Sequence, residues 1–108
     1  MKKAEQKFIN EEVLKEIEKI NKDCENGVQF ISRLRSCSAE VLASNNYYLL
    51  KSYNTIVAAI DNDGVCYDFL RYVYGYTATS AQHIAKFFSD YGRGAWRSDM
   101  KIYRYYPI

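Results

Sequence analysis

Apolar residues recur every three or four positions in the first quarter of the chain, with charged residues between them. This spacing is typical of an amphipathic helix with one narrow apolar stripe. The apolar positions are Ile9, Val13, Leu14, Ile17 and Ile20. The pattern predicts a helix over residues 1–26 that ends at Asn26 and Gly27 and packs on a surface or against another helix. Asn10 is an acceptable N-cap, so a break there and one continuous helix are both compatible with the sequence.

The pattern changes to alternation in the middle of the chain. Residues 28–38 fit a helix or a strand, and we favour a short helix because Phe30, Leu34 and Cys37 share helical spacing. The stretches that follow are rich in β-branched and aromatic residues and predict strands. They read EVLAS, YYLLKSY, TIVAAID and VCYDFLRYVY.

A tight turn at Asp61-Asn62-Asp63-Gly64 separates the last two of these strands. Asp and Asn tolerate the positive φ of such a turn, and glycine adopts it freely. Successive side chains of a strand point to opposite faces. The returning strand is therefore expected to place Val65, Tyr67 and Phe69 on one face and Cys66, Asp68 and Leu70 on the other.

Residues 80–91 predict a second amphipathic helix, with Ile84 and Phe88 buried against the sheet. Thr79 and Gln82 have the spacing of a capping box, and Gly92 follows the helix end. The stretch MKIYRYY then predicts an edge strand. Together the elements predict one α+β domain over residues 1–108. Its antiparallel sheet has about four to five strands within residues 40–106, with the N-terminal helix and helix 80–91 packed around it.

Composition places the chain among folded globular proteins. Of 108 residues, 48% are hydrophobic and 26% are charged. No run approaches the 18 apolar residues of a membrane span, and no apolar segment follows the first lysines as in a signal peptide. Cys24, Cys37 and Cys66 are odd in number and widely spaced, which argues against a disulfide framework or zinc module. We therefore expect a cytosolic protein with reduced, largely buried thiols.

The candidates for catalysis or metal binding are weak. His83 is the only histidine, and no nucleophile or metal-ligand pattern accompanies it, so we interpret it as a half-exposed residue in the first turn of its helix. Asp61 and Asp63 resemble the start of a calcium loop, but the remaining ligands are missing, and a turn explains them better. The sequence predicts a protein that is not an enzyme and uses no cofactor or metal.

The positive charge of the chain gathers in its C-terminal third. Residues 76–108 carry five Lys or Arg against two Asp, interleaved with aromatic residues in YGRGAWRSDMKIYRYY. Protein interfaces and single-strand nucleic-acid surfaces both favour this composition, although an edge strand with a polar loop also explains it. We predict partner-binding residues at Arg93, Trp96, Arg97, Lys101, Tyr103 and Arg104. Strand alternation allows only some of them to be exposed together.

Two motifs in the middle of the chain carry a resemblance. Ser52, Tyr53, Thr55, Val57 and Ala58 match a Ser-Tyr-x-Thr-x-Val-Ala strand. Thr79, Ser80, His83, Ile84, Lys86 and Phe87 resemble a Thr-Thr-Ser-x-His-Ile-x-Lys-Phe helix; here its first Thr is Ala78, and two residues in place of one separate Ser80 from His83. With the hairpin between them, residues 49–92 resemble a small uncharacterised domain of phages and mobile elements of Firmicutes and their relatives. The resemblance implies a phage or prophage origin, where many small proteins act against the host or its defences.

We therefore predict a non-enzymatic phage-type inhibitor or adaptor that acts in the host cytosol on a host protein or ribonucleoprotein. Its most concrete form is an anti-CRISPR protein that binds a Cas9-type nuclease without mimicking DNA, because the C-terminal third is basic. The alternative is a small nucleic-acid-binding or regulatory module that uses the same residues. The sequence leaves the oligomeric state open, a homodimer included, and does not tell whether the N-terminal helix packs on its own sheet.

Overall fold

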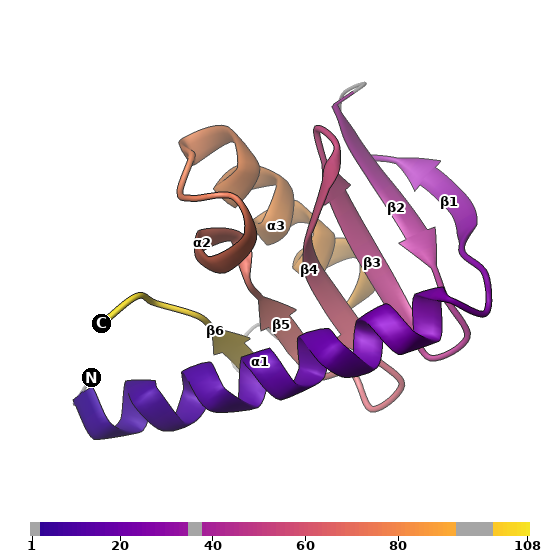
Figure 1. Cartoon of the computed structure of the whole chain (residues 1–108). Helices are drawn as coiled ribbons and strands as arrows, with labels where there is room; N and C mark the ends of the chain where they lie inside the picture. Colours follow the sequence, from indigo (N-terminus) through magenta and orange to yellow (C-terminus); the bar gives the residue numbers. More distant parts are fainter. Residues whose placement is uncertain (1–2, 35–37, 93–100) are drawn as a thin grey trace.

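A six-stranded sheet lies between two helical layers (Figure 1). The computed structural model describes residues 3–34, 38–92 and 101–108. The predicted α+β class with an N-terminal helix is confirmed, with six strands in place of four to five. In chain order the elements are α1 (Lys3–Cys24), β1 (Gln29–Arg33), β2 (Ala39–Ala43), β3 (Tyr47–Ser52), β4 (Thr55–Asp61), β5 (Cys66–Asp68), α2 (Leu70–Val73), α3 (Ala78–Tyr91) and β6 (Ile102–Arg104).

The strands follow the chain across the sheet, from β1 at one edge to β6 at the other. Strands β1 to β5 are antiparallel neighbours. Strand β6 runs parallel to β5, so the prediction of a wholly antiparallel sheet is wrong. The helices α2 and α3 lie between β5 and β6 in the sequence. Such a helical crossover returns the chain to the end of the sheet from which a parallel strand must start.

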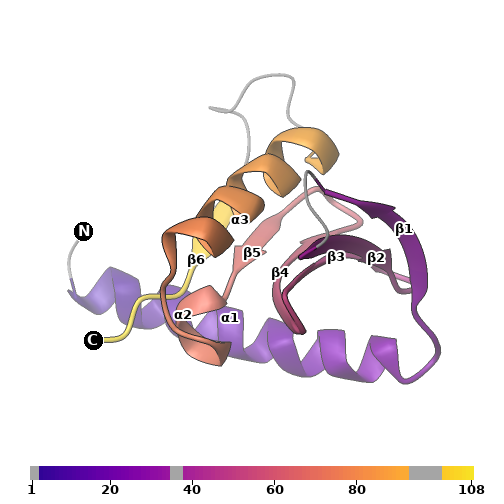
Figure 2. The ribbon, with the colours of Figure 1, turned by 90° about the horizontal axis from the view of Figure 1, so that it is seen from above.

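Each face of the sheet buries its own core. Helix α3 covers one face, where Leu50, Ala58 and Phe87 are fully buried. Helix α1 crosses the opposite face, where Val13 and Leu49 are fully buried (Figure 2). Because both faces are covered, the central strand β4 has a nearly continuous apolar sequence in place of a clean alternation.

The predicted turn between β4 and β5 is confirmed. Gly64 has φ +85°, and its N–H donates to Asp61 O at 3.0 Å. The Asp61 N–H in turn donates to Val65 O at 3.0 Å. The predicted alternation along the returning strand is confirmed as well: Val65, Tyr67 and Phe69 belong to the core under α1, and Cys66 and Leu70 belong to the core under α3.

Helix α1 is continuous through Asn10 and packs on its own sheet. Its apolar stripe buries Val13 and Ile20, as the periodicity predicts. Two amide side chains of the same helix, Gln6 and Asn10, are buried as well, each only 7% exposed. Buried polar side chains need hydrogen-bond partners, and these two find theirs on the last strand.

Gln6 and Asn10, together the amide clamp, hold the backbone at the end of β6. Asn10 Nδ2 donates to Tyr106 O at 2.7 Å, and Asn10 Oδ1 accepts from the Tyr106 N–H at 3.1 Å. Gln6 Nε2 donates to Arg104 O at 2.9 Å and to Asn10 Oδ1 at 2.7 Å. A side-chain amide offers the same donor and acceptor as a peptide group. Asn10 therefore pairs with the chain as a further strand would, and it satisfies backbone groups that point away from β5.

Two predictions of secondary structure differ from the observed elements. The short helix that we favoured within residues 28–38 is wrong, because Gln29–Arg33 form β1, which pairs with β2 from Gln29 opposite Ala43 to Arg33 opposite Glu40. Local spacing fits both structures, and the hydrogen bonds with a neighbouring strand decide between them. The predicted strand over VCYDFLRYVY is shorter than expected, since β5 ends at Asp68. The remaining candidate thiol, Cys37, lies outside the described residues.

The start of α3 also differs from the prediction. The helix begins at Ala78, and its N-cap is Thr77, whose Oγ1 accepts from the Ser80 N–H at 3.1 Å. Thr79 lies inside the helix and is exposed, so its predicted capping box is wrong. Gly92, predicted to follow the end of this helix, is its C-cap in the structure.

We expect Asn10→Ala to lower the free energy of unfolding by about 2–3 kcal/mol, because it removes several hydrogen bonds of a buried amide and leaves Tyr106 backbone groups unpaired. Urea unfolding monitored by circular dichroism measures the change. Asn21→Ala is a matched control, since Asn21 is exposed on the same helix. It should be neutral or slightly stabilising, because alanine is the better helix former. Equal losses in the two variants would contradict the role of the clamp.

Candidate functional site

Of the six residues predicted for the C-terminal site, the structure describes Lys101, Tyr103 and Arg104. Arg93, Trp96 and Arg97 lie outside the described residues. Lys101 is exposed, and its Nζ lies 5.1 Å from the centroid of the Tyr103 ring. The Tyr103 ring packs toward α1, with its centroid 5.7 Å from that of Tyr67.

Arg104 has a structural contact on the other face of β6. Its Nε donates to Asp68 Oδ2 at 2.7 Å, and Asp68 is only 4% exposed. The same carboxylate accepts the Leu70 N–H through Oδ1 at 3.2 Å. A buried carboxylate needs such partners. Tyr103 and Arg104 therefore point to opposite faces and do not form one surface.

The residues after β5 form an exposed aromatic surface that the sequence did not predict. The carboxylate of Asp68 starts α2, and Gly75, with φ +104°, ends the short turn that follows. Tyr72, Tyr74 and Tyr76, on both sides of this turn, are exposed. The segment that carries them lies beside the C-terminal tail (Figures 1 and 2). We call this the Arg71 surface; it comprises Arg71, Tyr72, Tyr74, Tyr76, Tyr105 and Tyr106.

Arg71 is the centre of this surface. The carbon of its guanidinium lies 4.7 Å from the Tyr76 ring centroid and 4.5 Å from the Tyr106 ring centroid. Tyr72 and Tyr105 pack edge to face, with centroids 5.1 Å apart. Cation–π and edge-to-face contacts each contribute about 0.5–1.5 kcal/mol at such sites. These contacts hold α2 and the tail together while leaving Tyr74 and Tyr76 more than half exposed.

An exposed aromatic surface of this kind is more typical of a binding site than of a catalytic site. Soluble proteins rarely expose contiguous large side chains without a partner for them. Tyrosine and arginine are also the residue types that most often dominate the binding energy of interfaces. Among the six residues of the Arg71 surface, Arg71 is the only charged one.

The sequence contained a signal for this surface. Tyrosines alternate at positions 72, 74 and 76 around Gly75. The predicted strand VCYDFLRYVY included Tyr72 and Tyr74, which strand alternation would have placed on one face of the sheet. Glycine after a run of aromatic residues is also a turn signal, and that interpretation would have placed them at the surface.

His83 is buried, not half-exposed as we predicted. It is 6% exposed, and its Nδ1 lies 3.0 Å from Ser52 Oγ, which also lies 2.9 Å from Ser80 Oγ. Both serines are at most 2% exposed. The two motifs of the phage-type resemblance thus meet in one hydrogen-bonded cluster between β3 and α3.

The buried position of the serine–histidine cluster suits a structural role better than that of a nucleophile. A nucleophile must reach its substrate, whereas the Ser52 hydroxyl is buried and engaged by both Ser80 and His83. Tyr53 covers this end of β3, its ring centroid 6.3 Å from that of His83. The φ of Tyr53 is +59°, a conformation that costs a residue with a side chain about 1 kcal/mol or more. We interpret the cluster as the joint that fixes the first turn of α3 on the sheet.

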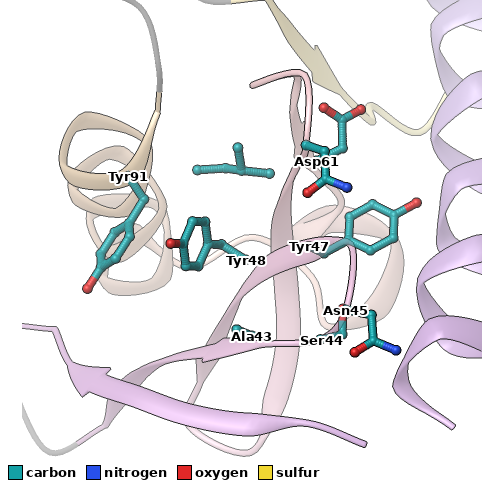
Figure 3. Close-up of a pocket in the computed structure, with 9 residues that line it drawn as sticks. Ala43, Ser44, Asn45, Tyr47, Tyr48, Asp61 and Tyr91 are labelled. Atoms are coloured by element: carbon teal, nitrogen blue, oxygen red, sulfur yellow. The ribbon is translucent and has the colours of Figure 1, made fainter. Parts of the chain in front are cut away.

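A hollow lies at the other end of β3 (Figure 3). It has a volume of about 240 Å³, and Tyr48 and Tyr91 line one side with ring centroids 5.3 Å apart. Its carboxylate, Asp61, already accepts the N–H groups of Asp63 and Val65 at 3.0 Å and the Tyr67 hydroxyl at 3.2 Å. Because these partners belong to the β4–β5 turn, Asp61 maintains the turn.

A further carboxylate beside this hollow holds the β2–β3 connection. Asp23 accepts the backbone N–H of Asn46 at 2.8 Å and its Nδ2 at 2.7 Å. The neighbouring Ser44 hydroxyl and these Asn46 contacts lower the pKa of Asp23. The charged form is therefore the one that ties the end of α1 to the sheet. No group of three or more potential metal ligands occurs within residues 3–34, 38–92 and 101–108.

Three buried side chains, Cys66, Tyr47 and Tyr67, have raised pKa values. Burial, together with the Asp61 carboxylate, raises the pKa of the Cys66 thiol to about 11. Burial also raises the pKa of Tyr47, whose hydroxyl donates to Glu16 Oε1 at 2.6 Å, and that of Tyr67. Low reactivity is expected of Cys66, because the thiolate is the nucleophile.

The fold and the Arg71 surface define a small α+β protein with an exposed aromatic surface. The chain belongs to the family of unknown function DUF8033, whose model matches residues 15–102. No curated protein and no solved structure matches the chain. Within the part of the chain that the structure describes, no helix is long and apolar enough to span a membrane.

We expect His83→Ala to destabilise the protein by about 2–4 kcal/mol, because it opens a cavity and removes one of the two hydrogen-bond partners of the buried Ser52 hydroxyl. Thermal and urea unfolding measure the loss. Gln82→Ala is the control, since Gln82 is the exposed neighbour on the same turn, and it should change stability by less than about 0.5 kcal/mol. A neutral His83→Ala would show that the cluster does not hold α3.

Alkaline pH should destabilise the fold. Cys66 keeps its proton more tightly when folded than when unfolded, where its pKa is about 9.0. Its contribution is thus complete below about pH 9 and falls as pH rises toward 11, and the two tyrosines act in the same direction. We expect Cys66 to account for about 2 kcal/mol of lost stability between about pH 8 and pH 10.5. Urea unfolding at both pH values checks this, and Cys66→Ala should show a shallower decline.

Proposed function

We propose that the protein is a non-enzymatic inhibitor or adaptor that binds a host macromolecule in the host cytosol through the Arg71 surface. The observation that carries the proposal is the set of exposed tyrosines gathered around the Arg71 guanidinium. Tyr74 and Tyr76 offer large rings with polar tips and few rotatable bonds, so little conformational entropy is lost when a partner covers them.

The charge of the surface favours a protein partner over a nucleic acid. Binding to a phosphate backbone gains its strength from several cations, whereas this surface carries one. The Arg71 guanidinium is also already in contact with the Tyr76 and Tyr106 rings. The nucleic-acid module remains the second candidate, because exposed tyrosine rings can stack on bases.

The most specific form of the proposal is an anti-CRISPR protein that binds a Cas9-type nuclease, alone or loaded with its guide. It rests on the resemblance of residues 49–92 to the phage-type domain. Such a protein would contact a protein surface or the guide, because its basic C-terminal third does not suit mimicry of DNA.

Site-specific photocrosslinking in the host cell tests the binding surface. With p-benzoylphenylalanine at Tyr74 or Tyr76, we expect an adduct of discrete mass, because both side chains are more than half exposed. Lys86, exposed on α3 away from this surface, is the control position and should give none. Arg71→Ala should weaken the adduct at position 76 without changing the melting temperature by more than a few degrees. Equal adducts at positions 76 and 86 would refute the surface.

Binding to a naked oligonucleotide at moderate salt separates the two candidate partners. We expect no sub-micromolar binding to a single-stranded DNA or RNA oligonucleotide at about 150 mM salt, since a single cation releases few counterions. Fluorescence anisotropy measures this binding.

A purified Cas9-type nuclease, with and without guide, serves in the parallel assay, where target cleavage should be blocked. Tight binding to the naked oligonucleotide would favour the nucleic-acid module, and uninhibited cleavage would remove the anti-CRISPR form.

A further inference from the structure

The two edges of the sheet differ in how they are closed. At β6, the amide clamp pairs with the backbone of Arg104 and Tyr106. At the other edge, β1 pairs with β2 alone, and no described residue pairs with its outer side. Figures 1 and 2 show no other described segment beyond β1. A strand that ends a sheet presents alternate N–H and C=O groups to the outside, which form a template for a further strand.

The side chains of this edge are apolar and exposed. Val28 is 44% exposed, Phe30 53% and Ile31 39%. Charges, proline and glycine are the usual means by which proteins block an open edge, and residues 28–32 contain none of them; the charge of β1 is at its last residue, Arg33, which pairs with Glu40 of β2. A short segment of high β-propensity and no charge pairs readily with an identical segment.

The one irregularity in β1 does not remove the edge. A bulge interrupts the register with β2 between Phe30 and Ser32. Bulges can turn an edge away from self-pairing. Here the extra residue is Ile31, an exposed apolar residue, and ladder pairing continues on both sides of it.

We propose that a second copy of this chain covers the open edge, with β1 pairing antiparallel to the β1 of the second copy. With a two-fold axis at Ile31, Ile31 would face Ile31 of the second copy, and Phe30 would face its Ser32. In this register Gln29 faces Arg33 of the second copy, so no like charges oppose each other. Pairing identical strands about a two-fold axis is a self-complementary contact that closes at the dimer.

The proposed dimer does not depend on the proposed function, because the two surfaces lie at opposite edges of the sheet. Strand β1 lies at one edge, and the Arg71 surface lies beside β6 at the other. The dimer would present two Arg71 surfaces, one at each end of a continuous sheet. A partner with two binding sites would then be held more tightly than by one copy alone.

Sedimentation velocity over about 1 to 200 µM tests the dimer. A short edge-to-edge contact buries a small area, so we expect a dimer that forms within this range. The Phe30→Lys, Ile31→Lys double variant should stay monomeric with an unchanged circular dichroism spectrum, because charges would face each other across the axis. Phe8→Lys is the matched control, since Phe8 is 57% exposed on α1, and it should dimerise as wild type does.

Disulfide trapping tests the register. In a chain whose three cysteines are replaced by alanine, Ile31→Cys should form a disulfide-linked dimer under mild oxidation, because facing residues near the axis lie within the Cα separation of a disulfide. Phe8→Cys should form none. A wild-type chain that is monomeric at about 200 µM, or a dimer that survives the double lysine substitution, would overturn the proposal.

Discussion

The amide clamp on the last strand is the contact on which the rest of the structure depends most. Asn10 presents a side-chain amide to the backbone of Tyr106, and Gln6 does so to Arg104. A helix normally packs on a sheet through apolar contacts, which fix its distance but allow it to slide. Directional hydrogen bonds to one strand end fix its position. The first turns of α1 and the last residues of the chain are thereby joined.

This joint also determines the geometry of the candidate binding surface. The backbone of Tyr106 is held by Asn10, and its ring lies over Arg71. Asp68 connects the same region from the other side, because one of its oxygens binds Arg104 and the other starts α2. Tyrosines of the Arg71 surface therefore rest on a framework of buried hydrogen bonds. Such preorganisation reduces the entropy that a binding partner would have to offset.

Covering both faces of the sheet leaves its ends and edges for contacts with other molecules. Helix α1 occupies one face, and α3, fixed through His83 and Ser52, occupies the other. Exposed large apolar side chains gather at the α2 corner and along β1, while others, such as Phe8 and Tyr53, lie elsewhere. A small protein with one extended sheet thus has two separate apolar regions, and we assign a different partner to each.

The sequence alone determined the elements whose signals are local. The periodicity of α1, the Asp61–Gly64 turn and the alternation that followed it all matched the structure, because each depends on neighbouring residues. The inward orientation of Phe88 followed from helical spacing in the same way. The two motifs that contain Ser52 and His83 were also visible in the sequence. No local pattern indicated that these residues touch, since they are 31 positions apart.

Only the tertiary structure decided the features that depend on distant partners. Residues 29–33 became a strand because β2 supplied hydrogen bonds, and β6 became parallel because a helical crossover preceded it. His83 was buried because β3 offered it a serine, and Tyr72 and Tyr105 came together because the chain returned past α2. For residues 28–38 the local spacing fitted both a helix and a strand. Contacts between segments far apart in the chain, which no local pattern encodes, selected one of them.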